Sequence, residues 1–107
     1  MNIITNDNEK FILGIEALKN VIDPEIGLNV ADLGLTYQID FDEDNKKVYC
    51  TMTLTTQFCP MGQSISHGVT NALEHTFSDF EIEVNVIFNP PWNSQKISKK
   101  GREFLNQ

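Results

Sequence analysis

The sequence predicts a mixed α/β (α+β) fold, a two-layer sandwich in which helices cover one face of a small three-stranded mixed sheet. Apolar residues recur at helical spacing in two segments, residues 6–22 and 60–77. Apolar and polar residues alternate in three others, residues 35–41, 48–55 and 81–88. The order is helix, strand, strand, helix, strand, with a short last helix, and elements in such an order pack as two layers around one core.

The first helix is predicted to begin at Asn6, which with Glu9 three residues later resembles a capping box. Its buried face is marked by four residues at helical spacing: Phe11, Ile15, Leu18 and Ile22. Asp23-Pro24 should end this helix, because proline disfavours helical geometry in the residue before it.

Each predicted strand has one apolar face and one mostly polar face. The residues expected inside are Leu35, Tyr37, Ile39 and Phe41 in the first strand, Val48, Cys50, Met52 and Leu54 in the second, and Ile82, Val84, Val86 and Phe88 in the third. The polar segment DEDNKK between the first two strands predicts an antiparallel hairpin. The strand–helix–strand unit that follows favours a right-handed crossover, and hence a mixed sheet.

The second helix is expected over residues 60–77, and a short last helix over residues 98–105, capped by Ser98. The second helix has apolar or small residues at helical spacing: Ile65, Val69, Ala72, Leu73 and Thr76. Gly101 weakens the last helix by roughly 1 kcal/mol.

Length and composition predict one domain, residues 1–107, with a single core. The formal net charge of −7 disfavours binding to a nucleic acid backbone. The N-terminal residues have no signal-peptide pattern, and no apolar run is long enough to span a membrane. Two cysteines are too few for a disulfide framework. We therefore expect a cytoplasmic protein with free thiols.

Cys59 stands directly before Pro60, at the predicted start of the second helix. Proline is well tolerated at the first helical position, which would make Cys59 the N-cap. The unpaired N–H groups and the positive end of the helix dipole would then favour a thiolate, with a pKa below about 8. The alternative is a buried cysteine that fills a gap in the core. Cys50, on the inward face of a strand, is expected to be an inert core residue.

Three carboxylates, Asp23, Glu25 and Asp32, are candidates for metal ligation or proton handling. Their structural alternatives are helix termination for Asp23, a solvated charge for Glu25 and a turn or cap contact for Asp32. Thr55 and Thr56 end a strand, and their hydroxyls could donate to the Cys59 sulfur or to a ligand.

His67 and His75 are expected to be solvated residues of the second helix. Eight residues of helical rise separate His67 from Cys59 by about 12 Å, too far for a nucleophilic pair.

Three blocks of sequence together resemble the MIP18/PaaD-like family of iron–sulfur assembly domains, to which bacterial SufT-type maturation factors belong. The blocks are VIDPEIGLNVADLGLTYQI, MTLTTQFCP and VIFNPPWNSQKIS, and the resemblance extends from Ala17 to Leu105. The family motifs fall on Asp23-Pro24-Glu25, on Asp32-Leu33-Gly34-Leu35, on Thr55, Thr56, Cys59 and Pro60, and on Pro90-Pro91-Trp92.

The resemblance implies an α/β two-layer fold and a non-enzymatic factor in iron–sulfur protein maturation. It implies that Cys59 is the metal-binding thiolate of a site lined by Thr55, Thr56, Asp23 and Glu25. One thiolate cannot saturate a cluster that normally takes four cysteines, so a bound iron–sulfur cluster would be labile or shared with a second protomer or a client apoprotein. The expected partners are the iron–sulfur assembly machinery and its client proteins.

Two other classes of function remain as alternatives. A small cysteine-dependent thiol enzyme would use Cys59 as nucleophile, but no base stands at the right spacing. A KH-like RNA-binding module has a similar order of elements, but the sequence has no GxxG loop.

The outer face of the sheet is expected to be polar with little charge, and to support a homodimer through this face or through a strand edge. Its predicted residues are Thr36, Gln38, Tyr49, Thr51, Thr53, Asn85 and Ile87. Trp92, in the rigid loop NPPWNS, is expected to anchor this loop or to close one side of the Cys59 site.

Overall fold

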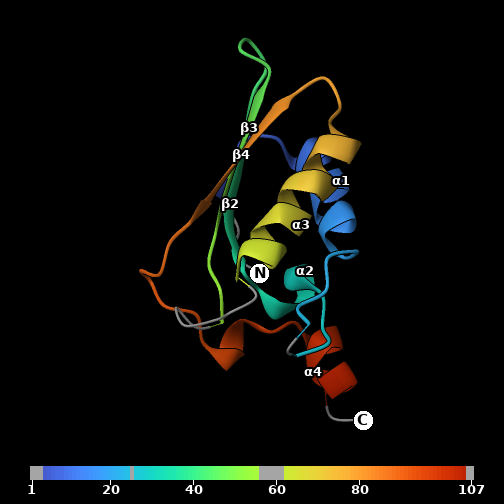
Figure 1. Ribbon diagram of the computed structural model, residues 1–107, viewed down its shortest axis with the longest axis vertical. Coiled ribbons are helices and arrows are strands. Elements are labelled where there is room, and N and C mark those ends of the chain that lie inside the picture. Colours follow the sequence, from blue (N-terminus) through green and yellow to red (C-terminus); the bar gives the residue numbers. More distant parts are fainter. Residues whose placement is uncertain (1–3, 25, 56–61, 106–107) are drawn as a thin grey trace.

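The computed structural model describes residues 4–24, 26–55 and 62–105. It is a two-layer α/β structure, with α1 and α3 on one face of the sheet and no helix on the other face in the described part (Figure 1). In chain order, the elements are β1 (Ile4–Thr5), α1 (Asn8–Leu18), α2 (Val30–Leu33), β2 (Thr36–Asp42), β3 (Lys47–Met52), α3 (Gly62–Thr76), β4 (Glu81–Val86), the 3-10 helix η1 (Ser94–Lys96) and α4 (Lys99–Leu105).

The sheet has four described strands in the order β1-β2-β3-β4, one more than the sequence predicted. The β2–β3 hairpin is antiparallel and β3 runs parallel to β4, which confirms the predicted mixed sheet. The additional strand, β1, pairs parallel with β2. Its two residues are too few to show an alternation in the sequence. Asn6 extends this pairing with its side chain, which donates to and accepts from the backbone of Phe41, both at 2.9 Å.

Helix α1 begins one residue later and ends well before the predicted positions. Its N-cap is Asp7, whose side chain accepts a hydrogen bond from the Lys10 N–H at 3.1 Å. Asn6 does not cap the helix, because its side chain is hydrogen-bonded to the backbone of Phe41 in β2. The helix ends at Leu18, so Asp23-Pro24 does not terminate it. Ile22 is therefore not part of the buried helical face: it is 51% exposed and forms an isolated bridge with Asn29.

Strand β2 departs from simple alternation near its start. The pairing of β2 with β3 shifts register between Thr36 and Gln38, and this irregularity places Thr36, not Tyr37, among the buried residues. Ile39 and Phe41 are buried as predicted. A β-bulge of this kind reverses the inside and outside assignment of the residues on one side of it, which is why the prediction for Tyr37 is wrong.

The inward residues of β3, Val48, Cys50 and Met52, are almost completely buried, as predicted. Thr53 follows the end of β3, and its N–H donates to the Leu35 carbonyl at 2.8 Å. Thr53 and Thr36 are buried, so neither belongs to the outer face to which they were assigned.

Helix α3 covers the sheet with Ile65, Val69 and Leu73 buried, whereas Thr76 is exposed. In β4, the side chains of Ile82, Val84 and Val86 are half-buried against the core. Phe88 lies beyond the end of β4 and is 41% exposed, so the prediction that it points inward is wrong.

The sequence did not predict two short helices, α2 and η1. Both lie near α4, at the end of the molecule where β2 begins and β3 ends (Figure 1). Ser98 caps α4 as predicted, since its hydroxyl accepts from the Gly101 N–H at 3.0 Å. A Cβ at Gly101 would lie 2.9 Å from the side chain of Leu28, so glycine at this position allows α4 to approach the segment before α2.

Candidate functional site

The segment between α1 and α2 is a compact loop that buries Asp23. The N–H of Asp23 donates to the Leu28 carbonyl at 3.0 Å, and its carbonyl accepts from the Gly27 N–H at 2.7 Å. Gly27 has a φ of +82°, which favours glycine. Asp23 is 1% exposed, and an aspartate is rarely buried to this degree unless the fold supports it with polar interactions. The predicted site residue Asp23 is thus held firmly in a closed turn.

Asp32 has a different role, as a hydrogen-bonding link between α2 and α4. One carboxylate oxygen accepts from the Asn29 amide and the other from the Ser98 hydroxyl, both at 2.8 Å. Burial raises the pKa of Asp32, but these hydrogen bonds, helped by Lys19 and Lys100, lower the pKa below its ordinary value overall. The Asn29 side chain also accepts from the Asp32 N–H, as the N-cap of α2. The structure therefore supports the cap contact for Asp32.

Of the five residues predicted to line the site, the structure describes Asp23 and Thr55. Thr55 is half-buried, three residues after the end of β3. Glu25, Thr56 and Cys59 lie outside the described residues, as does Pro60, so the N-cap position of Cys59 remains a prediction.

The described residues that flank Glu25 and the segment 56–61 in sequence lie near one another, at one end of the molecule. Leu28 and Leu54 belong to the same buried core cluster as Ile65 in the second turn of α3. A Cβ at Gly68 of α3 would lie 3.0 Å from the side chain of Val21, so α3 packs closely on the loop that holds Asp23. Figure 1 shows this loop, the chain leaving β3 and the start of α3 in the same half of the molecule.

Trp92 anchors the C-terminal segment to this end of the fold, as predicted. Its indole N–H donates to the Leu33 carbonyl at 2.7 Å, and its half-buried ring packs against the core. The Tyr37 hydroxyl donates to the Pro90 carbonyl at 2.6 Å, and the Lys96 ammonium lies 4.8 Å from the centre of the Tyr37 ring. Closure of the Cys59 site by Trp92 remains a prediction.

Sequence reasoning missed the part that Gly34 and Tyr37 have in this arrangement. A Cβ at Gly34 would lie 2.2 Å from the Lys96 carbonyl oxygen, so only glycine permits the observed approach of η1 to α2. Gly34 also has a φ of +74°, as the C-cap of α2. The signal available in the sequence was Gly34 itself, a glycine directly before a β-strand pattern.

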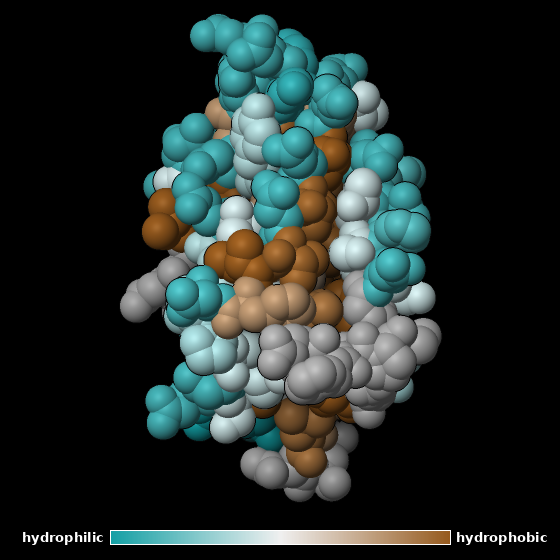
Figure 2. Space-filling view, turned by 60° about the vertical axis from the view of Figure 1, so that its left-hand side comes forward, coloured by the Kyte–Doolittle hydropathy of each residue, from teal (hydrophilic) through white to brown (hydrophobic). Residues whose placement is uncertain are grey.

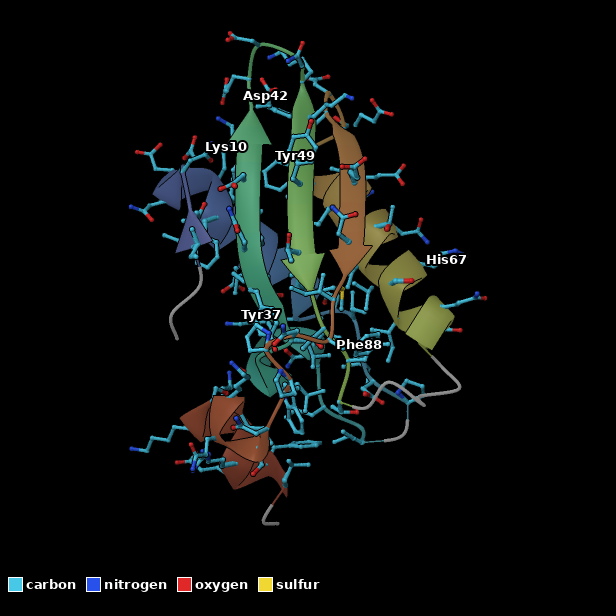
Figure 3. The ribbon with its side chains drawn as sticks, turned by 90° about the vertical axis from the view of Figure 1, so that its left-hand side faces the viewer. Lys10, Tyr37, Asp42, Tyr49, His67 and Phe88 are labelled. Carbon is cyan, nitrogen blue, oxygen red and sulfur yellow. The ribbon has the colours of Figure 1, made fainter. Side chains whose placement is uncertain are left out.

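Cys50 is enclosed in the core, and burial raises the pKa of its thiol to about 12. This confirms that Cys50 is a core residue, and both its burial and its raised pKa favour an unreactive thiol. His67 and His75 are exposed on α3, in agreement with their prediction as solvated residues (His67 in Figure 3).

Residues 4–24, 26–55 and 62–105 contain no group of three or more His, Cys, Asp or Glu side chains that could hold a metal ion. No helix in this part of the chain is long and apolar enough to cross a lipid bilayer.

Comparison with known proteins identifies the family. The family model described as "Iron-sulfur cluster assembly protein" matches residues 15–86. Among curated proteins, the chain is 41% identical over 83 residues to the Fe-S protein maturation auxiliary factor YitW of Bacillus subtilis, covering 78% of this chain and 80% of YitW. It is 38% identical over 81 residues to the Fe-S protein maturation auxiliary factor SufT of Staphylococcus aureus, covering 74% of this chain and 89% of SufT.

Solved structures support the same conclusion. A crystal structure of a domain of unknown function, DUF59, from Bacillus anthracis has a TM-score of 0.84 and 38% identity, and the match covers 92% of this chain and 93% of that chain. A conserved hypothetical protein from Thermotoga maritima has a TM-score of 0.76 and 34% identity, covering 100% of this chain and 99% of that chain. By sequence and by fold, the chain belongs to the family of iron–sulfur cluster assembly proteins.

Proposed function

We propose that this protein is a maturation factor that assists delivery of iron–sulfur clusters to client apoproteins, with the Cys59 thiolate as its cluster ligand. The family match over residues 15–86, which includes Cys59, supports the maturation role. The curated relatives are named maturation auxiliary factors, not enzymes, and none of them supports the alternative of a thiol enzyme. We infer that the protein acts without catalysing a reaction of its own.

The observation that supports Cys59 most directly is the state of the other cysteine. The chain has two cysteines, and the Cys50 thiol is enclosed in the core with a pKa of about 12. A thiolate, not a thiol, is the metal ligand, so Cys50 cannot serve without unfolding of the sheet. Cys59 is the one other thiol of the chain.

In this proposal the cluster is cargo and not a resident cofactor. Iron–sulfur clusters are commonly held by four cysteine thiolates, and one chain supplies one. Cys59 would therefore hold a cluster only together with sulfur ligands from a second protomer, an assembly protein or the client. Thr55, Thr56, Asp23 and Glu25 would shape the surroundings of the thiolate, and the buried turn at Asp23 would fix one side of them.

The remaining parts of the proposal concern the whole chain. We propose that residues 1–107 form one domain, because one core cluster includes residues of α1, α2, β2, β3 and α3. The homodimer and the cytoplasmic location remain predictions from the sequence, as does the lack of nucleic acid and membrane partners.

Anaerobic reconstitution with ferrous iron and sulfide tests the role of Cys59. The wild-type protein should gain visible iron–sulfur absorbance and should pass the cluster to an apo-ferredoxin. Cys59→Ser should lose both, with the melting temperature nearly unchanged. The matched control is Cys50→Ala, which should retain absorbance and transfer although it melts at a lower temperature. Retention of both properties in Cys59→Ser would contradict the assignment.

A further inference from the structure

Among the described strands, β4 has a neighbour on one side only, so the backbone groups on its outer side pair with no other described strand. β4 is the last strand of the described sheet, and Figure 3 shows it outermost beside β3 with α3 behind it. The Glu81 N–H donates to the Lys46 carbonyl and the Ile87 N–H to the Met52 carbonyl, both at 2.8 Å. In a parallel pair, alternate residues bond to the neighbouring strand. The intervening residues Ile82, Val84 and Val86 therefore direct their N–H and C=O groups away from β3, outward in the plane of the sheet.

The side chains of these same three residues form an apolar strip at the open edge. Ile82, Val84 and Val86 pack against the core but stay half-buried, so none is fully covered by α3. At the end of the strip, Ile87 is 36% exposed and Phe88 is 41% exposed. Figure 2 shows a band of hydrophobic side chains along this side of the molecule, with hydrophilic side chains at its margins.

The other face of β4 is acidic. Glu81, Glu83 and Asn85 are exposed there, and their partners on β3 are Lys47, Tyr49 and Thr51. The Lys47 ammonium nitrogen lies 3.9 Å from a carboxylate oxygen of Glu81. Glu83, in contrast, is paired with Tyr49 and not with a basic residue of β3. Tyr49 is in turn paired with Asp40 of β2, which adds a further negative charge. A cation beside Glu83 would be favoured, because opposite charges on neighbouring strands attract.

Pairing between the β4 edges of two copies of this chain is unfavourable. β4 contains no lysine or arginine, so antiparallel pairing of two β4 strands would place glutamates beside glutamates or beside Asn85. Like charges directly opposite each other on neighbouring strands are destabilising. The net charge of −7 adds to this repulsion.

We propose that the β4 edge binds, by strand addition, an extended segment of another protein in which apolar residues alternate with lysine or arginine. Backbone hydrogen bonds to Ile82, Val84 and Val86 would hold the segment. Its apolar side chains would cover the strip beside α3, and its basic side chains would lie beside Glu81 and Glu83. This proposal is independent of the cluster-binding role of Cys59.

The test uses three capped synthetic peptides of roughly seven residues, the length of a typical strand. In the first peptide lysine alternates with valine, in the second lysine alternates with glycine, and in the third glutamate alternates with valine. Binding is followed by two-dimensional NMR and by amide hydrogen exchange of the full chain. We expect the lysine–valine peptide to bind about tenfold more tightly than either other peptide, because it alone combines strand propensity with the complementary charge. Exchange should slow at Ile82, Val84 and Val86.

Two pairs of variants separate strand addition from general attraction of a basic peptide. Val84→Pro removes one outward N–H without removing a bond to β3, and its control Val84→Ala keeps that N–H; only the proline variant should weaken binding about tenfold. Glu83→Lys should reverse the preference between the lysine and glutamate peptides. Its control, Glu103→Lys on exposed α4, makes the same change of net charge and should leave the preference unchanged.

Several outcomes would overturn the proposal. These are equal binding of the lysine–glycine peptide, exchange protection confined to the acidic β2–β3 turn, and equal effects of Glu83→Lys and Glu103→Lys. A rise in molecular mass without peptide, abolished by Val84→Pro but not by Val84→Ala, would show that the edge binds a second copy. If Val84→Pro does not fold, the Glu83 and Glu103 pair decides.

Discussion

The thiol of Cys50 lies on the inner face of β3, where burial raises its pKa from an ordinary value of 9.0 to about 12. The folded state therefore keeps the Cys50 proton over a range of pH in which the unfolded state has already lost it. The stability from this difference is fully present below pH 9 and decreases as the pH rises from about 9 towards 12.

Cys50→Ala should therefore flatten the decrease of stability at alkaline pH. The experiment is urea unfolding between pH 7 and 10.5, with Cys59→Ser in both proteins so that only the Cys50 thiol differs. The free energy of unfolding should fall more steeply with pH when Cys50 is present. Parallel pH profiles for the two proteins would show that burial does not hold the proton on Cys50.

The Asp32 carboxylate accepts from Asn29 and Ser98, and its pKa is below the ordinary value. Ser98→Ala removes one of these bonds and also the cap of α4, so it should cost about 1–2 kcal/mol of stability at neutral pH. A carboxylate with a lowered pKa contributes stability above the pKa of the unfolded state, about 4, and loses it as the pH falls further. The cost of Ser98→Ala should therefore shrink in acid.

Asp32→Asn serves as the control for this pair, since asparagine has the same shape and does not titrate. In the Asp32→Asn background, the cost of Ser98→Ala should no longer depend on pH below about 5. Thermal unfolding of the four proteins at pH 3 and pH 7 measures the coupling. A pH-independent cost of Ser98→Ala in the wild-type background would argue against the link.

At the scale of the elements, α2 and the C-terminal segment meet at Gly34, where a Cβ would lie 2.2 Å from the Lys96 carbonyl oxygen. Gly27 provides a matched comparison, because its φ is +82°, similar to the +74° of Gly34, but among the described residues no atom outside its two chain neighbours lies within 4 Å of an added Cβ. The two positions thus share the backbone penalty and differ in the available space.

Gly27→Ala should cost about 1–2 kcal/mol, the penalty of a left-handed conformation for alanine. Gly34→Ala should cost clearly more, about 3 kcal/mol or above, since it must also displace η1 from α2. Chemical unfolding of both variants measures the difference, and near-ultraviolet circular dichroism of Trp92 reports whether the C-terminal segment has moved. Equal costs would mean that this segment is not packed on Gly34 in solution.

At the scale of the whole molecule, the open face of the sheet is more acidic than the sequence suggested. Carboxylates of β2 and β4, those of Asp40, Asp42 and Glu83, flank this face on both sides of β3. The uncharged residues Gln38, Tyr49, Thr51 and Asn85 lie among them. Figure 3 shows Tyr49 and Asp42 on this face. The predicted homodimer would therefore bring negative charges together if it used this face.

We expect self-association to strengthen with salt, because salt screens exposed charges beyond about 10 Å at 0.1 M. Light scattering from low to high ionic strength measures the mass against the 12.2 kDa of one chain. Tyr49→Glu should weaken the dimer by adding a charge at the centre of the face, whereas Thr76→Glu, on exposed α3, should not. A mass of 12.2 kDa under all conditions, with and without iron, would contradict the dimer.

Periodicity predicted most of the layered fold, because the burial of Val48, Cys50 and Met52 in β3, and of Ile65, Val69 and Leu73 in α3, depends on local side-chain spacing. It failed where a contact distant in sequence decides the local structure. The pairing of Asn6 with Phe41 moves the start of α1 to Asp7, and the register shift in β2 moves Tyr37 out of the core. Neither contact leaves a trace in the spacing of nearby residues.

The sequence by itself determined the family, through motifs at fixed spacing, and the mixed sheet, through the order of its elements. It also predicted different roles for the two cysteines: strand alternation placed Cys50 in the core, and the adjacent proline placed Cys59 at the start of a helix. Only the tertiary structure decided that Asp23 is buried in a closed turn, that the Ser98 hydroxyl donates to Asp32, 66 positions away in sequence, and that β4 is the edge strand of the described sheet. The physical reason is that periodicity reports which side of an element is apolar. Burial of a carboxylate, a hydrogen bond between distant residues and an unpaired backbone edge depend on which elements become neighbours.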